Sequence, residues 1–497
     1  MYELFIHLDA HKKSALYEQI YESIKNDIVD GKLTCGEKLP STRLLAAHLS
    51  ISRSTVETAY GQLVSEGYIE ARKGSGYYVC DIGQLYGTGG LSKSGARHQA
   101  QDTQAVEISM ETQMKIQMKN PIKIPSQMQP QPDRDVKIDF FPGRIDAKAF
   151  PYQVWRKVNK EALLELEYES LEAGHPQGEY RLRKAIAGYL YRARGVRCVP
   201  EQIVVGAGNE SLLQLLSQML SGPRVAVMES PTYLQAYHTF CNMGYCVKAV
   251  PMDDGGIRVE EIPLEDASLV YVMPSHQFPF GSVMPFKRRR QLLAWAKERE
   301  GRYIIEDDHD SEFRYVGKPI PSLHSMEKQG RVIYLGTFSN SIMPSIRVSY
   351  LALPPELLRV YFEKCGFYSP TVSRSLQSAV CKFMEGGYFE RHLNKMRRVY
   401  KGKHDELLRL LKGKPWVERI YGGRAGLHIG VEMKSALSEE EIMARAKKRG
   451  VRVQGMSGYY IEGRRAPGDH PILLLGFGNL TVEQIREGVA VLEECVR

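Results

Sequence analysis

Apolar residues recur at helical spacing near the start of the chain. Between residues 14 and 31, an apolar side chain comes at every fourth position: Leu16, Ile20, Ile24 and Ile28. This spacing places all four on one face of a helix, and a glycine at position 31 is a residue that ends helices. The pattern predicts one amphipathic helix over this stretch.

Two more helices follow at short intervals. Ser41 can cap a helix that runs to about residue 49, and a tight link at residues 50–52 leads to a third helix over about residues 53–66. The third helix has an inward face at helical spacing, which consists of Val56, Ala59, Tyr60 and Leu63. Its first turn, with Arg53, Ser54 and Glu57, then faces outward. This is the arrangement of a helix-turn-helix whose second helix enters a major groove.

The pattern changes to extended segments after residue 67. Residues 68–72 and 77–79 read as two short strands, joined by the sequence Lys73-Gly74-Ser75-Gly76. This predicts a small hairpin, or wing. The glycines at its tip would let the backbone approach a phosphate or the minor groove.

Hydrophobic periodicity is lost over residues 81–137, which are rich in Gly, Ser, Gln, Met and Pro. This composition predicts a flexible tether. The alternation of Met114, Ile116 and Met118 leaves open a short strand or helix that docks on a partner.

The remaining residues, 138–497, alternate helical segments with short apolar runs. The runs are rich in β-branched residues and lie at residues 203–205, 224–228, 269–272, 303–305 and 332–335. Such a pattern predicts a mostly parallel sheet covered by helices on both faces. We expect a large part over about residues 150–365 and a small α/β part over about residues 366–497.

Composition adds limits to this picture. A chain of 497 residues is too long for one core. Its net charge of +9 is compatible with a polyanionic partner without proving one. Eight scattered cysteines form neither a disulfide framework nor a metal motif, and no run of about 18 apolar residues is present. We therefore expect a cytoplasmic protein with no bound metal and no membrane contact.

Residues 39–76 carry the motif L-P-S-T-R, then S-R-S-T-V-E-T-A-Y and E-G-Y-I, then G-S-G. The motif resembles the GntR family of bacterial winged-helix regulators. The resemblance implies an N-terminal α/β winged helix over residues 1–80 that binds a double-stranded DNA operator. Its motif assigns DNA contacts to Arg43, Ser52, Arg53, Ser54, Thr55, Lys73 and Gly74. The plainer alternative is that Arg43 and Arg53 only solvate helix ends.

A second series of motifs covers about the last 360 residues. It includes G-E-Y-R-L-R-K-A-I-A, G-A-G-N-E, E-S-P-T-Y, P-S-H-Q-F-P-F-G, E-D-D-H-D-S-E-F-R-Y and G-T-F-S-N-S. Taken in this order, the motifs resemble fold-type-I aminotransferases, which use pyridoxal phosphate, in the form found in MocR-type regulators.

The aminotransferase resemblance implies a role for each motif. Asn209 and Glu210 lie where a helix N-terminus cradles the cofactor phosphate, and Thr337 and Arg347 would also hold it. Tyr233 would stack on the pyridine ring, and Asp307 would pair with the ring nitrogen. Tyr233 could instead be a core tyrosine, and Arg347 could belong to a structural ion pair. Asp307 is harder to explain otherwise, since a carboxylate after a buried strand needs a partner.

The chain departs from the family at the position of its Schiff-base lysine, which Asn340 occupies. An amide nitrogen cannot condense with an aldehyde, so no catalytic residue is assigned and any cofactor would bind noncovalently. His309 stands where a tyrosine near the ring hydroxyl is usual. Glu210 replaces a frequent glutamine, and its charge would repel a phosphate unless it is neutralised.

Together these features indicate a MocR-like regulator that dimerises and senses a small molecule. An amino acid, an amine or a vitamin B6 vitamer is the expected effector. Two versions remain open, a noncovalent cofactor sensor and a domain kept for dimerisation or another ligand. The alternative from a different class is an active aminotransferase that carries a DNA-binding domain.

Overall fold

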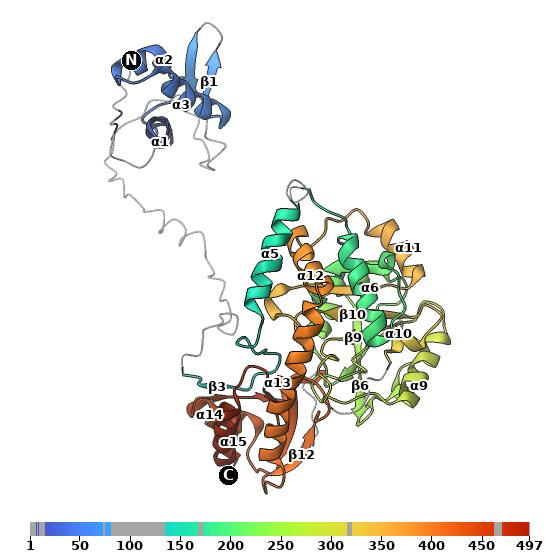
Figure 1. The fold of residues 1–497 in the computed structure, drawn as a ribbon. Helices are drawn as coiled ribbons and strands as arrows, with labels where there is room; N and C mark the ends of the chain where they lie inside the picture. Colours follow the sequence, from blue (N-terminus) through green and yellow to red (C-terminus); the bar gives the residue numbers. More distant parts are fainter. Residues whose placement is uncertain are drawn as a thin grey trace, which may run out of the picture. The chain divides into compact units, whose positions relative to one another are not determined.

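The computed structural model describes residues 15–72, 75–80, 135–166, 172–315, 321–461 and 470–496, together with residues 6 and 8. The chain separates into two compact units, Met1–Pro125 and Ser126–Arg497, and each is described by itself (Figure 1). Most of the predicted tether, residues 81–134, lies outside the described residues. The wing residues Lys73 and Gly74 lie outside them too.

The first unit is a winged helix built as its periodicity predicts. Its elements are α1 (Leu16–Val29), α2 (Thr42–His48), α3 (Arg53–Ser65), β1 (Ile69–Arg72) and β2 (Gly76–Val79). The apolar positions of α1 and α3 meet in one buried core, with Ile20, Ile24 and Leu63 fully enclosed. Ser41 and Ser52 cap α2 and α3, because each side chain accepts a hydrogen bond from the backbone N–H three residues on. The strands β1 and β2 pair antiparallel as the wing.

The second unit contains an eight-stranded sheet in the order β4-β11-β10-β9-β8-β5-β6-β7. The strands are β4 (Ile203–Gly206), β5 (Val225–Ser230), β6 (Cys246–Asp253), β7 (Gly256–Ile257), β8 (Leu269–Val272), β9 (Tyr303–Asp308), β10 (Val332–Thr337) and β11 (Ser349–Ala352). The central strands β6, β5, β8, β9 and β10 run parallel, while β11, β4 and β7 pair antiparallel at the edges. The predicted mostly parallel sheet is therefore confirmed.

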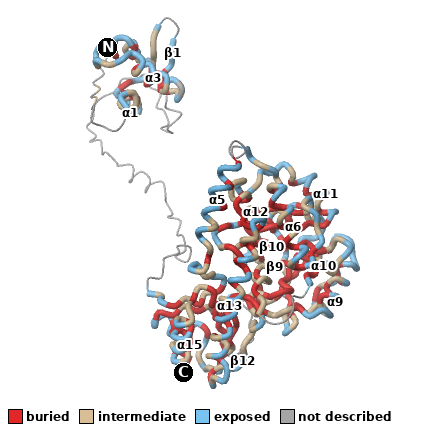
Figure 2. Tube along the Cα trace, in the orientation of Figure 1, coloured by how far each residue is buried: buried red, intermediate tan, exposed pale blue. Residues whose placement is uncertain are grey.

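Helices cover both faces of this sheet, as its apolar runs predict. They are α5 (Tyr152–Leu166), α6 (Tyr180–Arg194), α7 (Asn209–Met219), α8 (Leu234–Asn242), α9 (Phe286–Lys297), α10 (Leu323–Met326), α11 (Pro355–Lys364), α12 (Arg374–Glu385) and α13 (Tyr388–Leu411). Neighbouring residues of β9 face opposite ways: Ile304 packs in the cluster with α9, and Ile305 in the cluster with α7 and α8. Both side chains are fully buried, and β9 is buried along its whole length (Figure 2).

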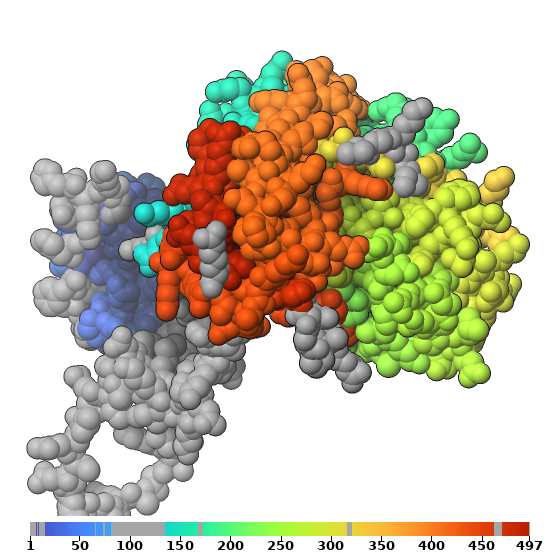
Figure 3. Space-filling model, turned by 90° about the horizontal axis from the view of Figure 1, so that it is seen from below, coloured from blue at the N-terminus to red at the C-terminus, as the bar shows by residue number. Residues whose placement is uncertain are grey.

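The C-terminal part adds a second, smaller sheet. Its four strands lie in the order β12-β13-β16-β15, with bounds Val417–Tyr421, His428–Met433, Ile472–Gly476 and Gln454–Gly455. Helices α14 (Glu439–Lys448) and α15 (Val482–Val496) accompany it, and β3 (Ile138–Asp139) pairs with β14 (Val451–Arg452). In Figure 3 the orange-to-red C-terminal residues lie beside the green-to-yellow residues of the large sheet. In the described part of the chain, no helix has the length and apolar character needed to cross a lipid bilayer.

Candidate functional site

A cavity of about 260 Å³ lies where β9 and β10 end. Ligands bind at the carboxyl ends of strands in sheets of this kind, and the volume is near the lower end of small-molecule sites. Its lining comprises Phe141, Pro142, Gly143, Asn209, Tyr233, Gln235, Met273, Phe278, Asp307, His309, Asp310, Ser339, Asn340, Pro344, Arg347, Leu427, His428 and Tyr459. The fold thus brings together Asn209, Tyr233, Asp307, His309, Asn340 and Arg347 from the predicted set.

Asp307 is the polar group at the floor of this cavity. It ends β9 and is 2% exposed. The Tyr271 hydroxyl and the Asn209 side-chain amide both donate hydrogen bonds to its Oδ2 atom. Its Oδ1 atom is buried and has no partner among the described residues. Burial raises the pKa of Asp307 to about 6. A buried carboxylate oxygen without a donor is costly, so this atom suits a ligand that carries an N–H group.

The residues expected to hold a phosphate meet at the start of α7. Gly208 has φ +96°, and a Cβ atom added there would clash with the Arg347 guanidinium. The Arg347 Nη2 atom lies 2.7 Å from Glu210 Oε2, and the Tyr233 hydroxyl lies 3.3 Å from Glu210 Oε1. The guanidinium is half exposed and remains open to a ligand. The repulsion expected from Glu210 is therefore offset by an ion pair with the arginine predicted to hold phosphate.

Thr337 and Glu210 do not themselves line the cavity. Thr337 ends β10 and is buried, and its hydroxyl accepts hydrogen bonds from Ser349 Oγ at 2.9 Å and from the Ser339 backbone N–H at 3.2 Å. Ser339, which the sequence analysis did not select, lies in the lining instead. Thr337 thus supports the loop that carries Ser339 and Asn340.

Asn340 lies in the loop that follows β10, at the cavity wall. Its Nδ2 atom donates a hydrogen bond to the backbone carbonyl of His309 at 3.1 Å. Among the described residues that line the cavity there is no lysine. The position that the resemblance assigns to the reactive lysine carries a carboxamide, and no described lining residue supplies a primary amine.

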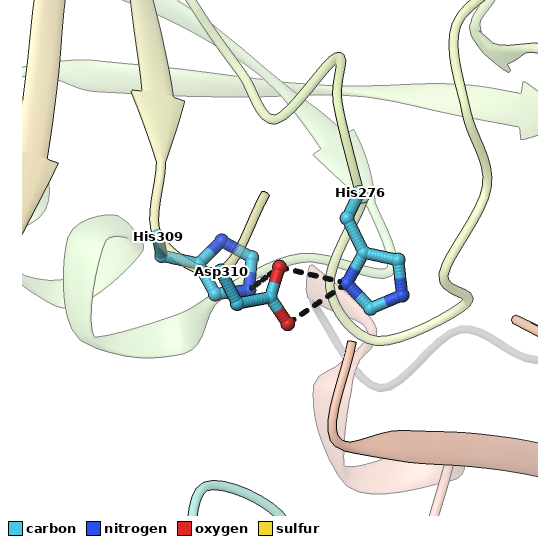
Figure 4. Close-up of side chains that lie close together, drawn as sticks. All are labelled: His276, His309 and Asp310. Atoms are coloured by element: carbon cyan, nitrogen blue, oxygen red, sulfur yellow. Dashed lines mark hydrogen bonds and ion pairs between the residues drawn. The ribbon is translucent and has the colours of Figure 1, made fainter. Parts of the chain in front are cut away.

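A histidine–aspartate cluster forms one side of the cavity. Figure 4 shows the Asp310 carboxylate between the rings of His276 and His309. His276 Nδ1 is 2.9 and 3.0 Å from the two Asp310 oxygens, and His309 Nε2 is 3.4 Å from Oδ1. Burial alone would raise the pKa of Asp310, but the two rings outweigh it and hold that pKa below its usual range. Burial would likewise lower the pKa of His309, but Asp310 and Asp307 raise it.

His276, Asp310 and His428 were not selected from the sequence. His276 and Asp310 form, with His309, a set of two imidazoles and a carboxylate whose donor atoms lie within 4.8 Å of one another. Hydrogen bonds from the His276 ring and an ion pair with His309 already occupy the Asp310 oxygens. The signal available in the sequence was position, because His276 follows β8 and Asp310 follows β9, which are adjacent parallel strands.

These residues fit pyridoxal phosphate without its covalent link. The unpartnered Asp307 oxygen can accept a hydrogen bond from a protonated ring nitrogen, and Arg347 with the α7 N-terminus can hold a phosphate. Arg347 can lie directly against Gly208 because that residue has no side chain. The missing component is the amine that would bind the aldehyde.

The predicted DNA contacts that the structure describes lie at one end of the helix-turn-helix. Arg43, Ser52, Arg53 and Ser54 are exposed, and Thr55 is half-buried. The Ser52 hydroxyl accepts from the Thr55 backbone N–H at 3.3 Å and lies 2.8 Å from the Thr55 hydroxyl. The Arg53 Nε atom donates to Glu57 at 2.7 Å, and its side chain is 64% exposed. Arg53 is thus free to exchange this surface ion pair for a base or a phosphate.

Arg53→Ala tests this assignment. If Arg53 reads a base edge, the substitution should weaken operator binding by about 1–3 kcal/mol. Fluorescence anisotropy on an operator fragment selected with the native protein measures the change. Lys32→Ala, which removes a charge outside the predicted contact set in the same unit, is the control. Equal affinities for the Arg53 variant and the native protein would remove Arg53 from the interface.

Two protein-family models match this chain, one over each part. Residues 16–79 match the model described as "Bacterial regulatory proteins, gntR family", and residues 144–466 match "Aminotransferase class I and II". The probable rhizopine catabolism regulatory protein MocR of Rhizobium meliloti is 31% identical over 486 residues, which cover 97% of this chain and 94% of that protein. The chain belongs to the MocR-type regulators.

Other MocR-type relatives also align over their full length. The uncharacterized HTH-type transcriptional regulator YdeL of Bacillus subtilis is 37% identical, with 96% of each chain covered. The HTH-type pyridoxine biosynthesis transcriptional regulator PdxR of Corynebacterium glutamicum is 30% identical, with 99% of each covered. The kynurenine aminotransferase of Pyrococcus horikoshii superposes with a TM-score of 0.64 at 26% identity, over 73% of this chain and 91% of that one. The second unit therefore has the fold-type-I aminotransferase architecture.

Glu210→Gln tests how the negative charge of Glu210 affects phosphate binding in this MocR-type cavity. Removing one negative charge beside the phosphate position should strengthen binding of pyridoxal phosphate about five- to tenfold. Added salt should reduce the gain, because the ion pair is partly exposed. Calorimetric titration measures it, with pyridoxal, which lacks the phosphate, as the matched ligand. An equal change for both ligands would show that Glu210 does not act on the phosphate.

Proposed function

We propose that this MocR-type chain controls transcription by coupling a winged helix that binds DNA to a cavity that holds a small ligand reversibly. The observation that carries the proposal is the combination found in the cavity. It keeps a buried, unpartnered carboxylate oxygen at Asp307 but presents Asn340 where the family has its reactive lysine. A vitamin B6 vitamer, an amine or an amino acid adduct of the cofactor is the expected effector class. The relative PdxR is named as a regulator of pyridoxine biosynthesis, which supports a vitamer.

Each of these residues would contact a different part of the ligand. Asp307 would accept a hydrogen bond from the ring nitrogen, and Tyr233 would cover the ring. Arg347 and the N-terminus of α7 would hold the phosphate. Ser339 and His309, which is paired with Asp310, would complete the polar lining around the ligand. When bound, pyridoxal phosphate supplies an electron-withdrawing ring and an aldehyde, and the described lining of the cavity offers that aldehyde no amine.

The residues of this cavity suit reversible binding of a regulatory ligand better than catalytic transamination. Transamination requires a group that forms the covalent link and carries a proton, and a carboxamide does neither. The rival function, an aminotransferase with a DNA-binding domain, requires another residue in that role. A transamination assay with a panel of amino acids and keto acids distinguishes the two. Multiple turnovers by the native protein would favour the enzyme.

The proposed coupling acts through a homodimer. A ligand that prefers one arrangement of the two aminotransferase-like domains would shift the spacing of the winged helices and thereby change operator occupancy. Operator binding by the full chain, measured with and without saturating vitamers, amines and amino acids, tests it. The expected result is a change in operator affinity with at least one class. Identical affinity in every case would exclude ligand control.

A further inference from the structure

The orientation of Asn340 is fixed by its partner. A backbone carbonyl can only accept a hydrogen bond, so the Asn340 amide must turn its NH₂ group toward the His309 carbonyl, 3.1 Å away. The Oδ1 atom is then the acceptor that Asn340 offers to a ligand, beside the second hydrogen of its NH₂ group. Within the described residues this oxygen accepts no hydrogen bond. The cavity wall therefore presents an acceptor where the family has the ammonium or imine nitrogen of lysine.

The charged groups around the cavity favour a cation at the same place. The lining contains two buried carboxylates, Asp307 and Asp310, and one arginine, Arg347, which Glu210 already pairs. His309 is balanced by Asp310. The replacement of lysine by Asn340 removes one positive charge from this set. A ligand group that brings a positive charge and hydrogen-bond donors would thus replace what the sequence has lost.

The aldehyde and amine forms of the cofactor differ in charge and in hydrogen-bond donors. The aldehyde of pyridoxal phosphate has only an acceptor oxygen, which would meet the acceptor Oδ1 of Asn340. The aminomethyl group of pyridoxamine phosphate is an ammonium with three donors at neutral pH. A charge-assisted hydrogen bond changes affinity by about ten- to a hundredfold, and two facing acceptors lose that gain.

We propose that the cavity selects the amine form of its ligand, a pyridine ring that carries an aminomethyl group as in pyridoxamine phosphate, over the aldehyde form. The selection rests on the proposed function, since it concerns the same cavity. In this chain Asn340 is the specificity-determining residue. A lysine would capture the aldehyde and repel the ammonium, and the asparagine reverses both effects. Occupancy of the cavity then follows the concentration of the amine form of the ligand.

The test is calorimetric titration of the full chain with pyridoxamine phosphate and with pyridoxal phosphate. We expect the native protein to bind the amine at least about tenfold more tightly than the aldehyde. Asn340→Lys should reverse the order, and Asn340→Leu, which removes the acceptor at similar size, should bring the two affinities together. Asn242→Lys makes the same change at an exposed position of α8 and should keep the native preference.

Each outcome decides a different claim. Equal affinities, or tighter binding of the aldehyde by the native protein, overturn the selection and leave reversible ligand binding in place. Binding of neither form removes the proposed ligand together with the selection. A preference for the amine that survives in Asn340→Leu would show that Asn340 is not its source. The comparison of the two ligands on the native protein decides whether the cavity prefers the amine, whether or not a variant folds.

Discussion

Asn340→Lys is expected to turn reversible binding of pyridoxal phosphate into covalent capture. The Asn340 side chain lines the cavity, in the loop directly after β10, so a lysine there would place a primary amine beside the bound ligand. Condensation with the aldehyde should raise the apparent affinity by at least about two orders of magnitude. Borohydride reduction followed by intact mass measurement should show one added cofactor per chain in the variant and none in the native protein.

A lysine elsewhere should not reproduce this result. Asn242→Lys, on the exposed side of α8, should give no specific adduct. If Asn340→Lys takes up cofactor no more firmly than the native protein, the rest of the cavity no longer positions the ligand. The chain would then have kept the fold for dimerisation or for another ligand.

Asp307→Asn should weaken the binding of ring-protonated ligands by about a hundredfold or more, because it removes one member of a buried ion pair. The amide oxygen can still accept from Tyr271 and Asn209, so the shape of the site is preserved. Its NH₂ group would replace the unpartnered Oδ1 atom and oppose the ring N–H. Calorimetric titration of both proteins measures the loss.

Asp307→Asn should also remove the pH dependence of ligand affinity. Burial raises the pKa of Asp307 to about 6. Above that pH the carboxylate is ionised and accepts from the ring, and below it the protonated form has lost the charge that pairs with the ring. Affinity of the native protein should therefore fall as pH drops through 6, approaching about tenfold per pH unit. Asp254→Asn, at an exposed aspartate, should retain both affinity and pH profile. A native profile that is flat between pH 7 and 5 would contradict this role.

Much of the fold could be predicted because local pattern and tertiary structure agree. The four-residue spacing of Ile20, Ile24 and Ile28 corresponds to a buried helix face, and the serines at 41 and 52 cap the helices expected after them. Four of the five β-branched runs became the neighbouring parallel strands β5, β8, β9 and β10, and the fifth became the edge strand β4. The strands β6, β7 and β11 were not predicted: β7 has only two residues, and β6 and β11 both include polar positions.

The site could be predicted only as far as single residues carry a signal. A carboxylate after an apolar strand pointed to Asp307, and the asparagine in G-T-F-S-N-S pointed to Asn340. The partnerships between distant residues could not be predicted. The contact of His276 with Asp310 joins two loops, and the ion pair between Glu210 and Arg347 joins residues 137 positions apart. The hydrogen bond that orients Asn340 depends on a backbone carbonyl, which no sequence pattern marks.

The account rests on reversible, noncovalent occupation of the cavity. The most direct test is equilibrium dialysis of the full native chain against pyridoxal phosphate, the form able to react with a lysine. Borohydride treatment and peptide mass mapping follow. We predict saturable binding that dialysis removes completely, with no modified lysine among the cavity peptides. A stoichiometric adduct on a lysine, or the absence of saturable binding, would contradict the account.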